Sequence, residues 1–323
     1  MKKLNKTLLL LFMSFVFSRS QTTDCPSSED IKPCVCDKDS YNYLSVTCEG
    51  LTSGAQLQQA VKGMKDLKLS DFKLSNSSVG ILPGDIFAEM EIRLLSITFT
   101  NLTRLSESQN QPPFIGLEDS LEILDIRNAF VNESIPLSKL SLSHLKKLYI
   151  VQFEGNIMPV IPNDWFEMGP YQMRDLYLLD TSVSTVGSHA FESLEKLKMF
   201  ALTGGSITTL TRDIFSTPAI HLMSIDLSKN KISSLPENFF YQMPSLQEVF
   251  LESNALTTIS EVLFAPVWNL LTHVYYYGNP VDCNDNIKWI YKYRLPEILR
   301  GYCVSPEKLR NRYLDELTLN DFK

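Results

Sequence analysis

An apolar motif that recurs from residue 64 onward constrains the fold of this chain more than any other feature. The motif is L-x-x-L-x-L, with any apolar residue allowed at the leucine positions. Its start-to-start spacings are 28, 29, 24, 28, 24, 25, 24 and 25 residues. A regular period of this length indicates a solenoid in which each copy forms one coil. The nine copies begin at Met64, Ile92, Leu121, Leu145, Met173, Leu197, Leu222, Leu246 and Leu271.

The period and the motif together are the signature of leucine-rich repeats. The L-x-L segment places two apolar side chains on one face of a short strand, and stacked coils align these strands in parallel. The predicted fold class is therefore an α/β-type leucine-rich-repeat solenoid. Its concave face is a curved parallel β-sheet, and its convex face is irregular with short helices.

Two further sets of residues recur at fixed positions of the repeats. A phenylalanine lies five to seven residues before most of the later repeat starts, and these residues are expected to stack on the convex side of the core: Phe87, Phe114, Phe166, Phe191, Phe215, Phe240 and Phe264. The ninth motif position usually holds an asparagine that binds the loop backbone. Here it holds Asn230, Asn254 and Asn279, whereas the earlier copies carry Phe72, Thr100, Ala129, Phe153, Thr181 and Gly205.

The first residues predict export. Three lysines precede an uncharged apolar run from Leu8 to Phe17, and Ser18 and Ser20 stand three residues and one residue before a predicted cut ahead of Gln21. Residues 1–20 therefore have the pattern of a secretory signal peptide. The run is about half the ~20 residues needed to span a bilayer, which argues against a membrane anchor. Removal of residues 1–20 leaves 26 basic and 37 acidic side chains, a net charge of −11. Such a chain should repel nucleic acid.

The six cysteines lie only near the two ends, at Cys25, Cys34, Cys36, Cys48, Cys283 and Cys303. An even number in an exported chain indicates disulfides. A zinc site is the rival interpretation, but the C-x-C spacing and an oxidising compartment argue against it. Because a solenoid exposes its core at both ends, these residues predict caps. The predicted organisation is a cap at 21–63, repeats at 64–278 and a second cap at 279–323.

The cysteine spacing Cys25-x8-Cys34-x-Cys36-x11-Cys48 resembles the N-terminal cap of extracellular leucine-rich-repeat proteins. That resemblance implies the pairs Cys25–Cys36 and Cys34–Cys48. The segment from Asn279 to Cys283, followed by Trp289 and Cys303, resembles their C-terminal cap, although two of the usual four cysteines are missing. Loss of one whole bridge would leave Cys283–Cys303.

The mature chain also resembles a group of secreted arthropod proteins described as similar to the non-catalytic subunit of Oplophorus luciferin 2-monooxygenase. Three segments carry this resemblance: Ile31 to Cys36, Ile81 to Phe87, and Gly278 to Trp289. It implies an accessory or binding role. It does not imply light production or luciferin binding.

Side chains between the paired leucines are expected on the concave face, the largest surface of such a fold. Two groups of large side chains stand out there. The first contains Tyr149, Val151, Tyr177 and Leu179, and the second contains Phe250, Tyr275 and Tyr277. Contiguous exposed aromatic residues mark interfaces. The competing interpretation is that loops or the C-terminal cap cover them, which is most serious for Tyr275 and Tyr277.

Three N-glycosylation sequons follow the predicted signal, at Asn76, Asn101 and Asn132. Their glycans would keep partners away from the first repeats.

The sequence contains no catalytic motif, and its four histidines fall at unrelated repeat positions. No cofactor, metal site or enzymatic activity is therefore predicted. The preferred function is an extracellular binder of a protein partner, with an accessory subunit of a secreted complex as one form of that role. The alternative is a soluble recognition protein for glycans or microbial surfaces. A pull-down with a Tyr149→Ala/Tyr177→Ala variant, or a glycan array, would separate these two.

Overall fold

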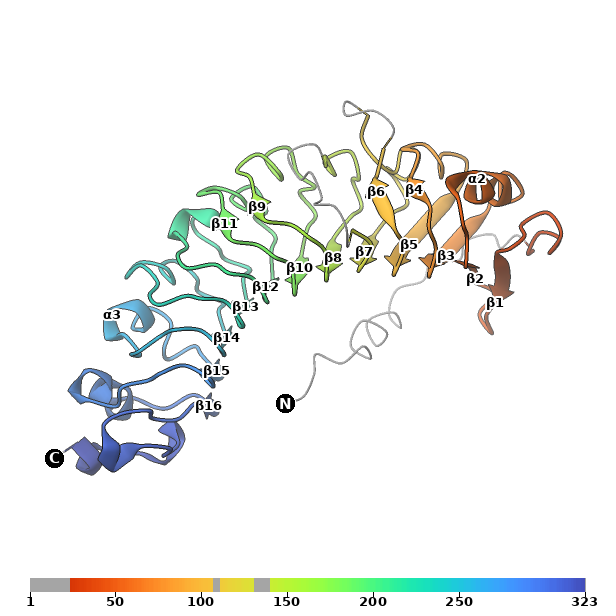
Figure 1. Ribbon diagram of the computed structural model, residues 1–323. Helices are drawn as coiled ribbons and strands as arrows, with labels where there is room; N and C mark the ends of the chain where they lie inside the picture. The colour runs from red at the N-terminus through yellow and green to blue at the C-terminus, as the bar shows by residue number, and fades with distance from the viewer. Residues whose placement is uncertain (1–23, 107–110, 131–139, 323) are drawn as a thin grey trace.

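The computed structural model describes residues 24–106, 111–130 and 140–322. They form a single curved solenoid whose inner side is a twelve-stranded sheet. Figure 1 shows the strands side by side along the inside of the arc, from the N-terminal cap in red to the C-terminal cap in blue. In order, the strands are β1 (Val35–Lys38), β2 (Leu44–Glu49), β3 (Lys68–Ser75), β5 (Glu91–Thr98), β7 (Ile123–Arg127), β8 (Ile150–Glu154), β10 (Asp175–Leu179), β12 (Met199–Leu202), β13 (Ser224–Asp226), β14 (Glu248–Phe250), β15 (His273–Tyr275) and β16 (Ile298–Arg300).

All neighbours in this sheet are parallel except β1 and β2. The convex side carries two small parallel pairs, β4 (Gly80–Ile81) with β6 (Leu102–Arg104) and β9 (Val160–Ile161) with β11 (Thr185–Val186). Otherwise it contains short helical turns: α2 (Gly54–Lys62), α3 (Glu261–Phe264), η3 (Arg212–Ile214), η4 (Asp285–Lys292), η5 (Glu307–Leu309), η6 (Leu314–Glu316) and η7 (Leu319–Phe322). The predicted fold class is confirmed.

The core is a continuous column of apolar side chains between the sheet and the return segments. The expected phenylalanine column is fully buried, and consecutive members such as Phe166 and Phe191 have ring centroids 6.2 Å apart. Phe200 from β12 packs edge-on against Phe215 at 5.0 Å. The convex column and the strand leucines therefore make one core. Among the described residues, no helix is long and apolar enough to cross a membrane.

Two coils differ in register from the sequence prediction. Strand β8 aligns Val151 with Leu176 and Phe153 with Leu178, so its motif begins at Leu148 rather than Leu145. Strand β3 aligns Phe72 with Leu95 and Leu74 with Ile97, so the first motif begins at Leu69 rather than Met64. Both shifts are by an odd number of residues, and each therefore exchanges the core face and the concave face.

The corrected registers also change the ninth motif position. That position is Asn156 in the coil of β8 and Ser77 in the coil of β3, not Phe153 and Phe72. The Asn156 carboxamide is buried and makes four hydrogen bonds to backbone groups of its own coil and the preceding one. Asn230, Asn254 and Asn279 each donate to a carbonyl of the preceding coil, at 2.8–2.9 Å. The asparagine ladder therefore reaches further toward the N-terminus than the sequence suggests.

A left-handed residue ends the concave strand of each coil and turns the chain toward the convex side. These residues, all with φ between 45° and 74°, are Gly50, Asn76, Phe99, Asn128, Gly155, Asp180, Gly204, Lys229, Ser253 and Gly278. Most are glycine, asparagine, aspartate or small polar residues, which tolerate this conformation best. Lys229 and Phe99 are the exceptions, and Phe99 is the only aromatic residue among them, a type that rarely adopts a positive φ.

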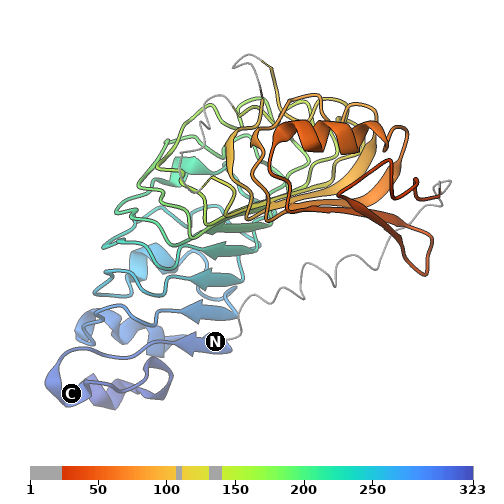
Figure 2. The same cartoon turned by 45° about the vertical axis from the view of Figure 1, so that its right-hand side comes forward.

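Both ends of the core are covered. At the N-terminus, the disulfides Cys25–Cys36 and Cys34–Cys48 join β1, β2 and the preceding loop. Figure 2 shows α2 lying across the coil from the β1–β2 hairpin at this end. Ser53 caps α2 by accepting a hydrogen bond from the Gln56 backbone N–H. At the C-terminus, Cys283–Cys303 closes the last coil. The three pairs are those implied by the resemblance to extracellular caps.

Candidate functional site

The concave sheet face is the surface on which side chains from successive strands lie side by side. Along each strand, residues of the motif point into the core, and the residues between them point outward. In β10, Leu176 and Leu178 are buried, whereas Tyr177 and Leu179 are partly exposed on the concave face. The predicted positions of Tyr177, Leu179, Phe250, Tyr275 and Tyr277 agree with this register.

Val151 does not belong to this face, and its prediction as a contact residue is wrong. Its side chain is fully buried in the core and pairs with Leu176. The cause is the shifted register of β8, which sends Ile150, Gln152 and Glu154 to the concave face instead. In the shifted register, Tyr149 no longer falls between the two paired apolar residues of the motif, and it lies immediately before the strand. It nevertheless remains near Tyr177, because both side chains pack against one apolar cluster.

This central cluster consists of Leu94, Ile123 and Ile150, which line up on β5, β7 and β8, with Tyr149 and Tyr177 packed against it. The three aliphatic side chains are only 7–8% exposed. The Arg174 guanidinium lies 5.3 Å from the centre of the Tyr149 ring. Burial raises the pKa of Tyr177 well above its usual range, and burial together with Glu122 raises the pKa of Tyr149. Both hydroxyls therefore stay protonated at physiological pH.

Ion pairs border the central cluster. On one side, Arg93 contacts Glu122 at 2.8 Å across β5 and β7. On the other, Arg127 contacts Asp125 at 2.6 Å, and Ser96 donates to the same carboxylate at 3.2 Å. Burial raises the pKa of Asp125, while Arg127 and Ser96 partly offset that rise. These contacts are all within the protein and surround a cluster whose three aliphatic side chains are buried, whereas Tyr149 and Tyr177 stay partly exposed.

The second predicted group lies near the C-terminal end of the same face. Phe250 and Tyr275 occupy paired positions on β14 and β15, and their rings stack with centroids 4.9 Å apart and planes 13° apart. His273 is nearly parallel to Tyr275 at 6.4 Å, and its Nδ1 lies 3.7 Å from Glu248 Oε1. Phe250, His273, Tyr275 and Tyr277 are all partly exposed.

The C-terminal cap extends this group rather than covering it. Strand β16 pairs in parallel with β15, which places Arg300 beside Tyr275. The Tyr277 ring centre lies 6.2 Å from that of Tyr302 and 6.5 Å from that of Tyr313. We define Phe250, Tyr275, Tyr277, Tyr302 and Tyr313 as the C-terminal aromatic row. Tyr302 and Tyr313 were not predicted. No L-x-x-L-x-L motif marks the additional strand β16, so the sequence offers no signal for them.

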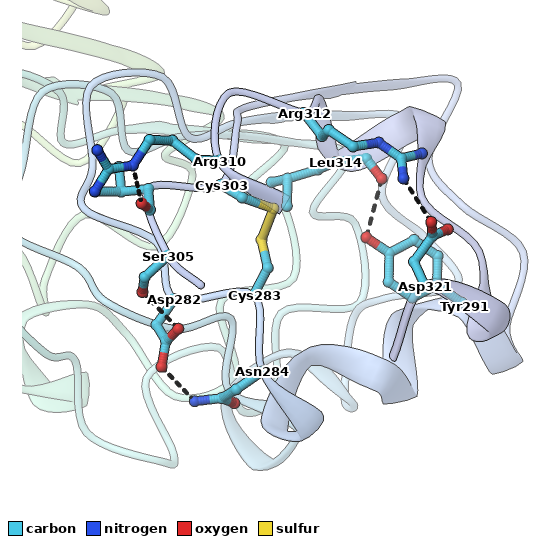
Figure 3. Close-up of a disulfide and its surroundings, with 11 residues drawn as sticks. Asp282, Cys283, Asn284, Tyr291, Cys303, Ser305, Arg310, Arg312, Leu314 and Asp321 are labelled. Carbon is cyan, nitrogen blue, oxygen red and sulfur yellow. Dashed lines mark hydrogen bonds and ion pairs between the residues drawn. A yellow bond between two sulfur atoms is a disulfide. The ribbon is translucent and has the colours of Figure 1, made fainter. Parts of the chain in front are cut away.

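Figure 3 shows how the cap is held in this position. The Cys283–Cys303 disulfide crosses the cap, and Asp282 accepts hydrogen bonds from Ser305 and Asn284 beside it. Further along, Arg312 pairs with Asp321 at 2.5 Å. These contacts hold the segments of the cap together at the end of the solenoid.

Carboxylates border the C-terminal aromatic row toward the centre of the sheet. Asp226 lies next to Phe250 in the sheet register, and Glu252 follows Phe250 by two residues on the same face. Burial raises the pKa of Asp226, and burial followed by the charge of Asp226 raises the pKa of Glu252. This end of the concave face therefore combines aromatic area with negative charge.

The remaining predicted positions lie away from the concave face. Asn76 and Asn101 are exposed, and the Asn76 Nδ2 donates to Glu49 Oε1 at 2.5 Å. Asn132 and the predicted signal peptide lie outside the described residues. Within residues 24–106, 111–130 and 140–322, no group of three or more His, Cys, Asp or Glu side chains is arranged to hold a metal ion.

Comparison with known proteins identifies the fold. A family model described as a leucine-rich repeat matches residues 220–272. No curated protein sequence matches. Among solved structures, a chain in a crystal structure of a TLR13–ssRNA13 complex is similar, with a TM-score of 0.58 and 21% identity. The similarity covers 73% of this chain and 32% of that chain, so this chain spans about a third of its length. The chain is thus a leucine-rich-repeat solenoid.

Proposed function

We propose that this protein is a secreted, non-catalytic binding protein that holds a protein partner on its concave face, centred on the C-terminal aromatic row. The observation that carries this proposal is the continuity of that row across two repeats and the cap, on a face that the cap leaves open. Large, rigid aromatic side chains bury much area for little loss of conformational entropy. An accessory role in an extracellular complex fits the same arrangement.

Secretion is supported by two independent features. Residues 1–20 have the pattern of a signal peptide. All six cysteines are paired in three disulfides, and none of them is free. Stable disulfides of this kind are typical of oxidising compartments. The resemblance to secreted arthropod accessory proteins points in the same direction.

A protein is a better fit than a glycan for this surface. Sugar rings bind aromatic side chains through the ring faces, but Phe250 and Tyr275 cover one face of each other. What the row offers is ring edges, hydroxyl groups and adjacent carboxylates, which suit the mixed polar and apolar surface of a protein. The acidic mature chain is also a poor match for nucleic acid.

The test is a comparison of baits in the extracellular fluid of the source. The mature chain, a Tyr275→Ala/Tyr277→Ala variant and a Tyr171→Ala/Tyr241→Ala control are immobilised side by side. Tyr171 and Tyr241 are 56% and 53% exposed and lie outside the strands of the concave sheet, so the control removes the same number of tyrosine side chains elsewhere. Circular dichroism verifies that each variant is folded.

We expect a protein that the mature chain and the control retain and that the Tyr275→Ala/Tyr277→Ala bait loses. Equal retention by all three baits would place the contact outside the aromatic row. A Tyr149→Ala/Tyr177→Ala bait, included in the same experiment, then reports whether the central cluster binds instead. If no bait retains a protein and a glycan array gives a signal, the recognition of glycans replaces the present proposal.

A further inference from the structure

Phe99 is the residue whose position the fold explains least. It follows β5 directly, has a φ of 49° and is 63% exposed. Equivalent positions in the other coils hold glycine or a polar residue. A bulky residue in the left-handed region is strained, and such strain is kept where it serves a function. Phe99 thus presents apolar area to water at a turn whose backbone conformation is unfavourable for it.

A sequon lies two residues farther along the chain, at Asn101-Leu102-Thr103. Between them, Thr100 is buried, and its hydroxyl donates to the Thr98 carbonyl at 3.1 Å. Thr100 is thus turned inward, whereas Phe99 and Asn101 on either side of it are exposed. The Asn101 backbone is fixed as well, because its N–H donates to Ser77 and its carbonyl accepts from Gly80. The aromatic ring and the amide thus lie two residues apart on the same exposed, hydrogen-bonded segment.

We infer that Asn101 carries an N-linked glycan and that the first sugar of this glycan packs on the exposed ring of Phe99. The glycan is transferred to the chain from a lipid-linked oligosaccharide. In this reaction, a bond forms between Asn101 Nδ2 and the anomeric carbon of the first sugar. The bond from that carbon to the lipid pyrophosphate breaks, the pyrophosphate leaves with the electron pair, and Nδ2 loses one proton. The C–H groups on one face of the sugar then cover apolar ring area that is otherwise in contact with water.

Asn76 is the nearest competitor for this role. It occupies the same turn position on β3 that Phe99 occupies after β5. Its Nδ2, however, donates to Glu49 of β2, which lies on the opposite side of β3 from β5. A sugar attached there would begin on the side away from Phe99. Asn101, which follows Phe99 on the same segment, is therefore the site assigned to the aromatic ring.

The inference rests on the proposed secretion of the chain and is independent of the concave binding site. The experiment therefore begins with the full chain in a eukaryotic host that secretes it. Peptide mass spectrometry of the secreted protein gives the occupancy of Asn101. Melting temperatures are then measured before and after enzymatic removal of glycans, for the native protein and for the variants Phe99→Ser, Phe99→Tyr, Asn101→Gln and Asn76→Gln.

Phe99→Ser is chosen because Ser253 occupies the equivalent turn position, so the variant should fold. We expect removal of glycans to lower the melting temperature of the native protein, the Phe99→Tyr variant and the Asn76→Gln variant by about 2 °C. We expect no such loss for Phe99→Ser or Asn101→Gln.

An unmodified Asn101 in secreted protein would overturn the inference and leave secretion intact. An equal loss of melting temperature in Phe99→Ser would show that the sugar does not use the ring. Failure of the chain to leave the cell would refute the proposed secretion and, with it, this modification.

Discussion

Replacement of Asn156 by alanine tests whether one buried carboxamide holds two coils together. The side chain of Asn156 is 2% exposed. Its Oδ1 accepts hydrogen bonds from the backbone N–H groups of Ala129 and Phe130, at 3.0 and 3.1 Å. Its Nδ2 donates to the carbonyls of Ile126 and Glu154, at 2.8 and 3.1 Å. The substitution removes all four bonds and leaves buried backbone groups without a partner.

The expected cost follows from these contacts. A typical hydrogen bond contributes ~0.5–1.5 kcal/mol net, and a buried polar group left unpaired costs ~1–3 kcal/mol. We therefore expect Asn156→Ala to lower the free energy of unfolding by about 3–5 kcal/mol. The matched control is Asn238→Ala, which removes an exposed asparagine from a return segment and should change stability by less than ~0.5 kcal/mol.

Urea denaturation followed by tryptophan fluorescence measures the effect. Trp165 is a local probe, because it is buried in the same coil and its Nε1 donates to the Leu140 carbonyl at 3.1 Å. Trp268 and Trp289 pack together near the other end of the solenoid and report on the distant coils. The transition reported by Trp165 should shift the most. A loss of less than about 1 kcal/mol in the free energy of unfolding, equal to that of the control, would refute the view that Asn156 joins the coils.

Three further predictions concern the core, the cap and a carboxylate. Phe166→Ala should lower the free energy of unfolding by about 3–5 kcal/mol, since it opens a cavity in the stacked phenylalanine column; an effect below ~1 kcal/mol in urea denaturation would contradict that packing. Cys283→Ser/Cys303→Ser opens a loop with a sequence separation of 20 residues and should cost about 3 kcal/mol, measured by thermal denaturation. Burial raises the pKa of Asp226 in the folded state above its value in the unfolded chain. At neutral pH the ionised carboxylate therefore lowers the stability of the folded state. This loss of stability disappears as the pH falls through the pKa of the folded state. Asp226→Asn should therefore be more stable than the native protein at pH 7, with a difference that shrinks on acidification; a difference independent of pH between 4 and 7 would contradict the raised pKa.

The sequence by itself determined the architecture. A motif with alternating apolar residues, repeated nine times, can bury its leucines only if the coils stack, so the parallel sheet and the convex phenylalanine column follow from local pattern. The cysteines at the two ends marked the caps for the same reason, because the core is exposed only there. Tyr177, Phe250 and Tyr275 lie on the concave face as predicted, since their motifs admit a single register.

Only the tertiary structure decided the register of two coils and the extent of the candidate site. Leu145, Leu148, Ile150, Val151 and Phe153 satisfy the motif in two ways, and hydrogen bonding of β8 to β7 and β10 selects the one that begins at Leu148. Side chains alternate with a period of two, so the shift of three residues places Val151 in the core and Ile150 on the concave side of the sheet. Tyr302 and Tyr313 joined the aromatic row because β16 pairs with β15, a contact between coils that no local pattern can specify.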